Sequence, residues 1–183
     1  MRKSKTFLIC TIVVLVCLTS SCSSTRRVSV ADGLAVDLLP ASAISQTIDA
    51  YQLMDGTIPG YGEAVLESYM VAGPEGIDLY LFAPTGQTIA HVVYDGQRAT
   101  MESDFIPHGD VAARYMAFDI QMCYADTRVI EESGLEVNEV SGERRTREIS
   151  YDGRLLYRIV FVGNTLTLEN IQRGYSYMLE TLE

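Results

Sequence analysis

Apolar residues alternate with a period of two along several short segments of this chain. The pattern is clearest at residues 165–170, where Leu166 and Leu168 alternate with Thr165 and Thr167. Further segments of this kind cover residues 77–83, 88–94, 155–162 and 175–182. A period of two matches the alternation of side chains along a strand, so the sequence predicts antiparallel strands joined by tight turns.

Turn signals separate these segments. Asp55-Gly56, Asp95-Gly96 and Asp152-Gly153 are dipeptides typical of the turns between hairpin strands. An alternative interpretation makes Asp95 and Asp152 a pair of catalytic carboxylates. The turn interpretation is favoured, because Asp in such dipeptides forms the local hydrogen bonds that the turn needs.

One stretch in mid-chain has helical character instead. After Pro107, Asp110 is expected to cap a helix over residues 111–123, and a shorter helix over residues 127–133 is expected to end at Gly134. About five strands precede these helices and about five follow. The predicted fold class is therefore mainly β (α+β), a curved antiparallel sheet or half-open β-barrel covered by the mid-chain helices, in a single domain over residues 37–183.

Several predicted strands are apolar on both faces, which exceeds what a sheet with one wet side requires. Two interpretations stay open. These residues pack against one another, as most apolar faces do, or a strongly curved sheet leaves an apolar hollow. Strand parity and helix face select nine candidate walls for such a hollow: Leu79, Leu81, Ile89, Val93, Phe118, Ile159, Phe161, Leu166 and Leu168.

The N-terminus has the features of a lipoprotein signal peptide. Basic residues at positions 2, 3 and 5 precede an apolar run over residues 7–18, which is shorter than the roughly 20 residues needed to cross a bilayer. Small residues then lead to Cys22. We expect cleavage of residues 1–21, acylation of Cys22 by chains such as palmitate, and a flexible tether over residues 22–36. Ordinary secretory cleavage and an uncleaved anchor are the competing interpretations.

Ser23 follows the expected lipidation site, and an Asp at this position often marks retention at the inner membrane. Ser23 therefore favours the periplasmic face of the outer membrane as the location. Residues 1–21 hold three of the 14 basic residues and none of the 24 acidic ones, so the mature chain carries 11 − 24 = −13 charges. Such a chain lacks the basic patch that nucleic acids require, and its membrane attachment is expected to depend on acyl chains alone.

No catalytic, metal or cofactor pattern is found in the expected mature chain. His91 and His108 are too isolated to predict a metal site, and Cys123, the only cysteine beyond Cys22, is interpreted as a small buried hydrophobe. The residues Met54 to Tyr61 form an apolar segment that is expected either to touch a membrane or ligand or to fold back on the core. We predict a monomeric protein that is not an enzyme and needs no cofactor.

Several motifs resemble an uncharacterised bacterial lipoprotein family of the domain-of-unknown-function type, whose members are often encoded beside the synthases that make aryl polyene pigments. The likeness runs from about Leu38 to the C-terminus and depends on the order of motifs in this sequence: Val93-Tyr94-Asp95-Gly96, Phe105-Ile106-Pro107, Asp119-Ile120-Gln121 with Tyr124, Asp152-Gly153-Arg154, Leu168-Glu169-Asn170, Gly174-Tyr175 and Glu180-Thr181.

That family in turn is similar to the LolA/LolB lipoprotein carriers, whose half-open barrel and helical lid enclose an apolar cavity. The resemblance implies a protein that binds an acyl chain, a polyene lipid or a lipoprotein and aids its transfer to the outer membrane. The alternative is a structural or scaffolding lipoprotein of an envelope complex. One departure concerns the lid, because Ala125-Asp126 stands where the family commonly has Trp-Pro.

Overall fold

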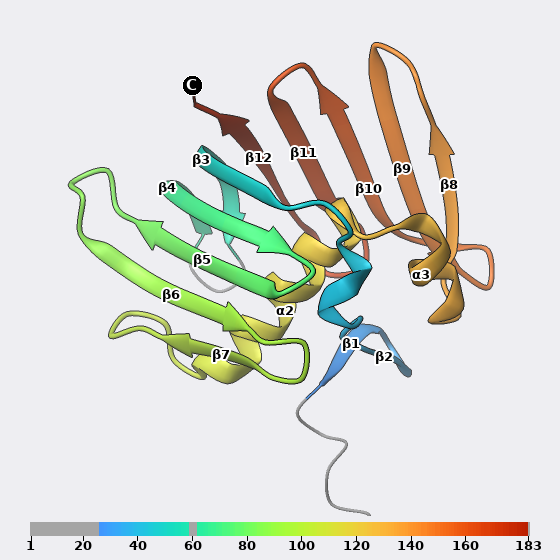
Figure 1. The fold of residues 1–183 in the computed structure, drawn as a ribbon, viewed down its shortest axis with the longest axis horizontal. Helices are drawn as coiled ribbons and strands as arrows, with labels where there is room; N and C mark the ends of the chain where they lie inside the picture. Colours follow the sequence, from blue (N-terminus) through green and yellow to red (C-terminus); the bar gives the residue numbers. More distant parts are fainter. Residues whose placement is uncertain (1–25, 59–61, 183) are drawn as a thin grey trace, which may run out of the picture.

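A computed structural model describes residues 26–58 and 62–182 of the chain. Its main element is a ten-stranded antiparallel sheet (Figure 1). The first five strands of this sheet are β3 (Ile48–Ile58), β4 (Gly62–Gly73), β5 (Gly76–Phe82), β6 (Thr88–Tyr94) and β7 (Ala99–Glu102). The last five are β8 (Glu136–Val140), β9 (Arg144–Tyr151), β10 (Arg154–Val162), β11 (Thr165–Asn170) and β12 (Tyr175–Thr181).

The sheet consists of two meanders that meet in the middle. The spatial order is β7-β6-β5-β4-β3-β12-β11-β10-β9-β8, so the two halves are joined by the pairing of β3 with β12. β7 and β8 form the two edges, and the sheet is not closed into a barrel. The prediction of a mainly β fold with a curved antiparallel sheet is therefore confirmed in its coarse form.

Two helices lie between the meanders in the sequence, α2 (Gly109–Tyr124) and α3 (Thr127–Glu132). α2 lies against one face of the sheet (Figure 1), which we call the inner face, and the opposite face is the outer face. The expected cap at Asp110 is wrong, since Asp110 lies in the first turn and His108 occupies the N-cap with φ of 56°. The expected glycine after the second helix is confirmed, because Gly134 has φ of +91°.

The prediction of a flexible tether through residue 36 is wrong for residues 27–36. Here the chain forms a hairpin of β1 (Arg27–Ala31) and β2 (Leu34–Asp37), followed by a short 3-10 helix, η1 (Ala41–Ala43). Val28 and Val30 are each only 1% exposed and belong to the hydrophobic core. The segment was predicted to be a tether because most of its residues are small or polar. Val28 and Val30 lie on one face of β1, and their burial holds the hairpin against the core.

The Asp55-Gly56 dipeptide is not a turn. Both residues lie inside β3, where Gly56 pairs with Tyr177 of β12. A Cβ atom at Gly56 would lie 2.5 Å from the Cα atom of Tyr177, so the absent side chain allows the two meanders to approach. Asp95-Gly96 and Asp152-Gly153 do form turns, with Asp95 Oδ1 accepting hydrogen bonds from the amides of Gln97 and Arg98.

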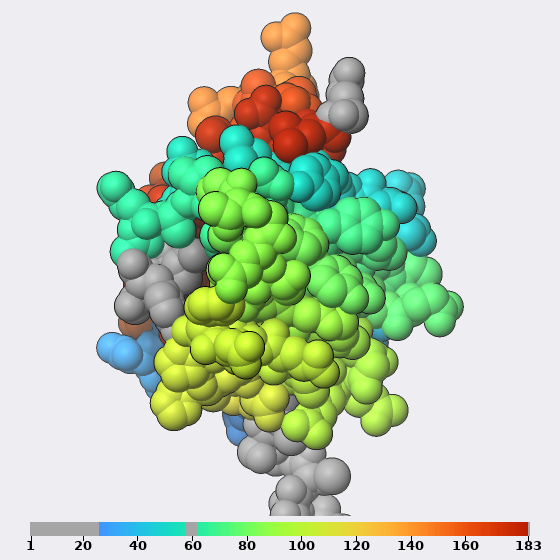
Figure 2. Space-filling model, turned by 90° about the vertical axis from the view of Figure 1, so that its left-hand side faces the viewer, coloured from blue at the N-terminus to red at the C-terminus, as the bar shows by residue number. Residues whose placement is uncertain are grey.

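The residues of β6 and β7 form one side of the molecule. Figure 2 views the molecule from the side of β6 and β7 and shows their green and yellow-green residues packed closely against those of the neighbouring strands. No helix among the residues that the structure describes has the length and apolar character needed to span a membrane.

Candidate ligand-binding cavity

A cavity of about 490 Å³ lies between the inner face of the sheet and α2. β3, β4, β5 and β12 supply one wall, and α2 with the loop before it supplies the other. Most of the lining side chains are apolar, and from the sheet they are Met54, Met70, Leu79, Leu81 and Leu179. From the helical side they are Ile106, Pro107, Val111, Ala112, Met116 and Ile120.

The dimensions and lining of this cavity suit a small apolar ligand. Ligand pockets in proteins commonly occupy about 300–1,000 Å³ and combine apolar walls with a few polar groups. Three of the lining residues, Met54, Met70 and Met116, are unbranched thioethers that adapt to guests of irregular shape. The arrangement can therefore enclose a flexible hydrocarbon chain without a large rearrangement of the sheet.

The cavity opens to solvent where β3 ends and α2 begins. Thr57, His108 and Val111 line it and are exposed, and Val111 retains 43% of its accessible surface. Met54 of the apolar segment considered above lies on the cavity wall, whereas Pro59 and Tyr61 lie outside the described residues.

An arginine also borders this opening. The guanidinium of Arg173 stacks over the ring of Tyr115, 3.7 Å from its centroid, and donates hydrogen bonds to the Tyr115 hydroxyl and to the carbonyl of Ser29. No ion pair joins Arg173 to a carboxylate within the described part of the chain. Its positive charge therefore remains available at the opening of the cavity.

A buried carboxyl lies at the same end of the cavity. Asp119 of α2 is 5% exposed and accepts hydrogen bonds from the hydroxyls of Tyr157 at 3.0 Å, Tyr175 at 2.7 Å and Tyr177 at 3.4 Å. Burial raises the pKa of Asp119 to about 7, against the opposing effect of the three hydroxyl donors and of Arg173. The cluster connects α2 to β10 and β12, and so holds the helix over the sheet.

Other residues of the sequence motifs form buried polar contacts. Asn170 donates a hydrogen bond to the Tyr175 hydroxyl at 3.1 Å, which extends the Asp119 cluster. Gln121 accepts from the amide of Leu39 at 2.9 Å and donates to its carbonyl at 2.8 Å, and Tyr94 donates to the same carbonyl at 2.5 Å. The motif residues thus fix α2 and the N-terminal segment to the sheet.

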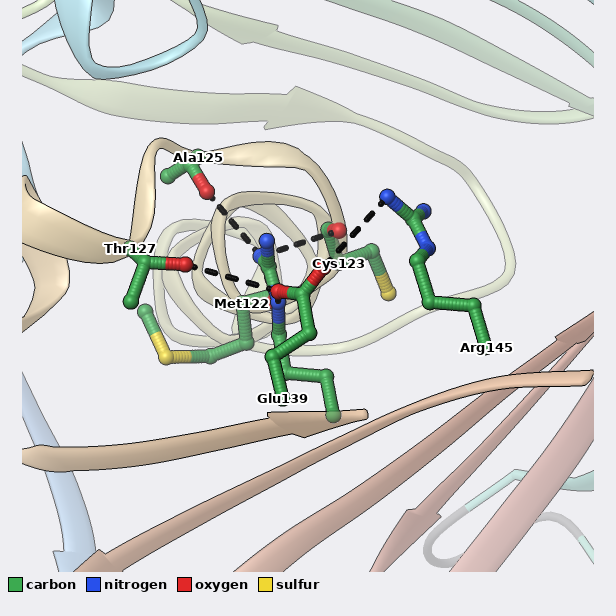
Figure 3. A network of polar contacts seen from close by, with 7 residues as sticks. Met122, Cys123, Ala125, Thr127, Glu139 and Arg145 are labelled. Atoms are coloured by element: carbon green, nitrogen blue, oxygen red, sulfur yellow. Dashed lines mark hydrogen bonds and ion pairs between the residues drawn. The ribbon is translucent and has the colours of Figure 1, made fainter. Parts of the chain in front are cut away.

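The C-terminal end of α2 is held by an arginine from β9. Arg147 is 5% exposed, and its Nη1 atom donates to the carbonyls of Met122, Cys123 and Ala125 at 2.9 to 3.2 Å. Its Nε atom donates to Glu139 at 2.8 Å. Figure 3 shows Glu139 and the labelled carbonyl residues gathered around the end of the helix. These bonds satisfy carbonyl groups that the helix leaves unpaired.

The structure brings only two of the nine predicted wall residues to the cavity, Leu79 and Leu81. The predicted orientation is wrong for Val93, since the buried residues of β6 are Ala90, Val92 and Tyr94 and Val93 has the other parity. Ile89 is half-buried and packs against the core, but it does not line the cavity. The remaining five lie elsewhere: Phe118, Ile159, Leu166 and Leu168 are buried in the core, and Phe161 packs against Tyr124 and Arg145.

Sequence reasoning missed most of the true wall. Met54 and Met70 belong to β3 and β4, for which no alternation was identified, and Tyr175 and Leu179 belong to a strand whose two faces are both partly apolar. One signal was present in the sequence. Met116 and Ile120 are four residues apart, as are Ala112 and Met116, so one face of the helix is continuous.

The residues considered for chemistry have other roles. His91 lies on the outer face, 2.8 Å from Asp78 Oδ1 and stacked on Tyr80. Cys123 is buried, and burial raises the pKa of its thiol well above the usual value. Within residues 26–58 and 62–182, no three His, Cys, Asp or Glu side chains gather closely enough to hold a metal ion.

A second hollow, of about 660 Å³, lies between β2 and α3. Its lining includes the segment from Leu34 to Pro40, which contains the charged residue Asp37, and the charged side chains of Arg27 and Glu132. Although its volume is larger, charged walls are less suited to a hydrocarbon than the apolar walls beneath α2. The cavity beneath α2 is therefore the better candidate for a functional site.

Comparison with known proteins gives a family match over most of the chain. A family model described as a protein of unknown function, DUF3261, matches residues 49–183, which include all ten strands of the main sheet except the first residue of β3. No curated protein matches the chain. Because the match covers most of the sequence, the chain belongs to the DUF3261 family.

Proposed function

We propose that this protein is a non-enzymatic lipid-binding module that accepts an acyl chain, a polyene lipid or the acyl part of a lipoprotein. The observation that carries the proposal is the apolar cavity of about 490 Å³ beneath α2, open to solvent beside Val111. Transfer of apolar surface from water into such a cavity is favourable. A chain of ~12 methylenes would gain on the order of 10 kcal/mol before the entropic cost of association.

The place of action is part of the same proposal. The apolar run before Cys22 supports export and acylation, and Ser23 supports the periplasmic face of the outer membrane. A curved sheet covered by helices over an apolar cavity also supports the likeness to the LolA/LolB carriers. On this basis the protein receives a hydrophobic cargo and aids its transfer to the outer membrane.

The first experiment is native mass spectrometry of the soluble domain, produced from residue 26 onward without the lipidation site. We expect co-purified lipid in the wild-type protein. The matched variants are Val111→Glu, at the cavity mouth, and Val65→Glu, on the outer face, because the two valines are 43% and 46% exposed.

Only Val111→Glu places a charge where an apolar chain must pass, so we expect it to lower lipid occupancy at least tenfold. Val65→Glu should leave occupancy unchanged. Absence of bound lipid in the folded wild-type protein, including after incubation with fatty acid, would contradict the proposal.

A scaffolding role is the second candidate, and one feature of the outer face favours it. Tyr51, Tyr69, Tyr80 and His91 occupy one row across β3 to β6, and Tyr51 and Tyr69 are 39% and 38% exposed. Aromatic residues are enriched in protein interfaces. A protein that binds no lipid but loses a partner on Tyr51→Ala/Tyr69→Ala substitution would support the scaffold in place of the carrier.

A further inference from the structure

One polar side chain on the cavity wall lacks a partner. Ser68 of β4 is 2% exposed, lines the cavity, and its Oγ atom makes no hydrogen bond within the described part of the chain. Buried hydroxyl groups are nearly always hydrogen-bonded, because loss of hydration without compensation is unfavourable. An unpaired buried hydroxyl at a binding cavity points to a partner supplied by the ligand.

The neighbours of Ser68 give this part of the wall a polar character. Gln52 of β3 lies directly opposite Ser68 in the strand register and also lines the cavity. Gln52 is 3% exposed, and its Nε2 atom donates to Thr181 Oγ1 at 3.3 Å. Thr181, Gln52 and Ser68 therefore form a polar row across three adjacent strands, and Leu81 continues it as an apolar residue on β5.

The position of this row sets where on a ligand the matching group must lie. Thr57, at the opening, and Gln52 are separated by five residues on β3, which corresponds to roughly 17 Å at about 3.4 Å per residue. With C–C bonds of about 1.52 Å at angles of about 111°, an extended hydrocarbon chain advances roughly 1.25 Å per bond, so 17 Å corresponds to roughly 14 bonds. Between the two ends the lining is apolar, with Met54, Met70 and Leu179.

The charge at each end restricts the chemistry of the ligand. Arg173 places a cation at the opening, which favours an anionic head group there. The polar row contains no charged side chain, and an ion without a partner in this buried position would be unfavourable. A serine hydroxyl both donates and accepts, and so it matches a neutral hydroxyl group on the ligand.

We infer that Ser68, supported by Gln52, forms a hydrogen-bonding subsite for a neutral hydroxyl group carried far along the chain of an anionic amphiphile. This inference rests on the proposed lipid-binding function and specifies its ligand class. The favoured ligand has a carboxylate beside Arg173 and a hydroxyl group roughly 14 bonds away.

The test compares three ligands of equal chain length by calorimetry on the unlipidated domain: hexadecanoate, its ω-hydroxy derivative and its α-hydroxy derivative. We expect the wild-type protein to bind the ω-hydroxy acid roughly 2- to 10-fold more tightly than hexadecanoate, as one added hydrogen bond implies. The α-hydroxy acid, whose hydroxyl remains at the opening, should show no such gain. Ser68→Ala should abolish the preference while hexadecanoate binds as before.

The control is Ser176→Ala, a serine on β12 that is exposed, and it should retain the preference. Ser68→Ala should also raise the melting temperature of the ligand-free protein by a few degrees, since it removes an unpaired buried hydroxyl. A lower melting temperature would identify Ser68 as a structural residue and overturn the inference.

The two levels of the proposal fail differently. Equal binding of hexadecanoate and its ω-hydroxy derivative, unchanged by Ser68→Ala, would overturn the subsite and leave the lipid-binding function standing. Absence of binding for all three acids would overturn the lipid-binding function, and the subsite with it.

Discussion

Ionisation of Asp119 should make the stability of the protein depend on pH. Burial raises the pKa of this carboxyl from 3.8 to about 7 in the folded state. Because the folded state holds the proton more tightly than the unfolded state, stability is greatest at low pH and falls as pH rises through the interval from about 4 to 7. One pKa unit corresponds to about 1.4 kcal/mol, so the total loss is about 4 kcal/mol.

Part of this loss has already occurred at mildly acidic pH. With pKa values of 3.8 and about 7, the linkage relation predicts that the free energy of unfolding decreases by about 2–3 kcal/mol between pH 5 and pH 8. Urea unfolding followed by circular dichroism at intervals across this range measures the change. Asp119→Asn removes the titrating group but keeps an oxygen that accepts from the tyrosine hydroxyls, and so it should flatten the profile.

Asp110→Asn is the matched control, since Asp110 lies on the same helix and is exposed. It should retain the wild-type slope. A wild-type profile that is flat from pH 5 to 8, or an Asp119→Asn profile as steep as that of the wild type, would refute the reasoning.

Three further predictions concern the fold and its attachment. Arg147→Met should lower the free energy of unfolding by about 3 kcal/mol, because three buried carbonyls and Glu139 lose their donor. In the same denaturation assay, Arg158→Met at an exposed ion pair should lower it by at most about 1 kcal/mol. Gly56→Ala should lower the free energy of unfolding by about 1–3 kcal/mol, since its Cβ would lie 2.4 Å from the carbonyl oxygen of Ser176. Gly142→Ala, whose Cβ would have its nearest atom at 3.8 Å, should leave the stability nearly unchanged. Equal effects of the two substitutions in thermal unfolding would contradict the close contact at Gly56. Cys22→Ala in the full chain should prevent incorporation of labelled palmitate and release the protein from membranes, and retained labelling would exclude Cys22 as the lipidation site.

Local pattern was sufficient for the order of the elements. The limits of β6 and β11 agree with residues 88–94 and 165–170, since period-two alternation between turn residues depends only on neighbouring side chains. The same reasoning gave two helices between two runs of five strands. It failed at residues 27–37, because a hairpin with only two fully buried side chains in one strand has almost no periodic signal.

The sequence by itself therefore determined the class of fold and the acidic composition, and it is the basis for the proposal of export. Only the tertiary structure decided which strands meet at the β3–β12 junction, which parity of β6 faces inward, and where a cavity remains. The physical reason is that a void is a property of the space between elements. Its walls come from residues far apart in the chain, such as Ser68 of β4 and Leu179 of β12. These residues meet at one cavity only because of the long-range pairing of the strands and the volume that α2 leaves unfilled.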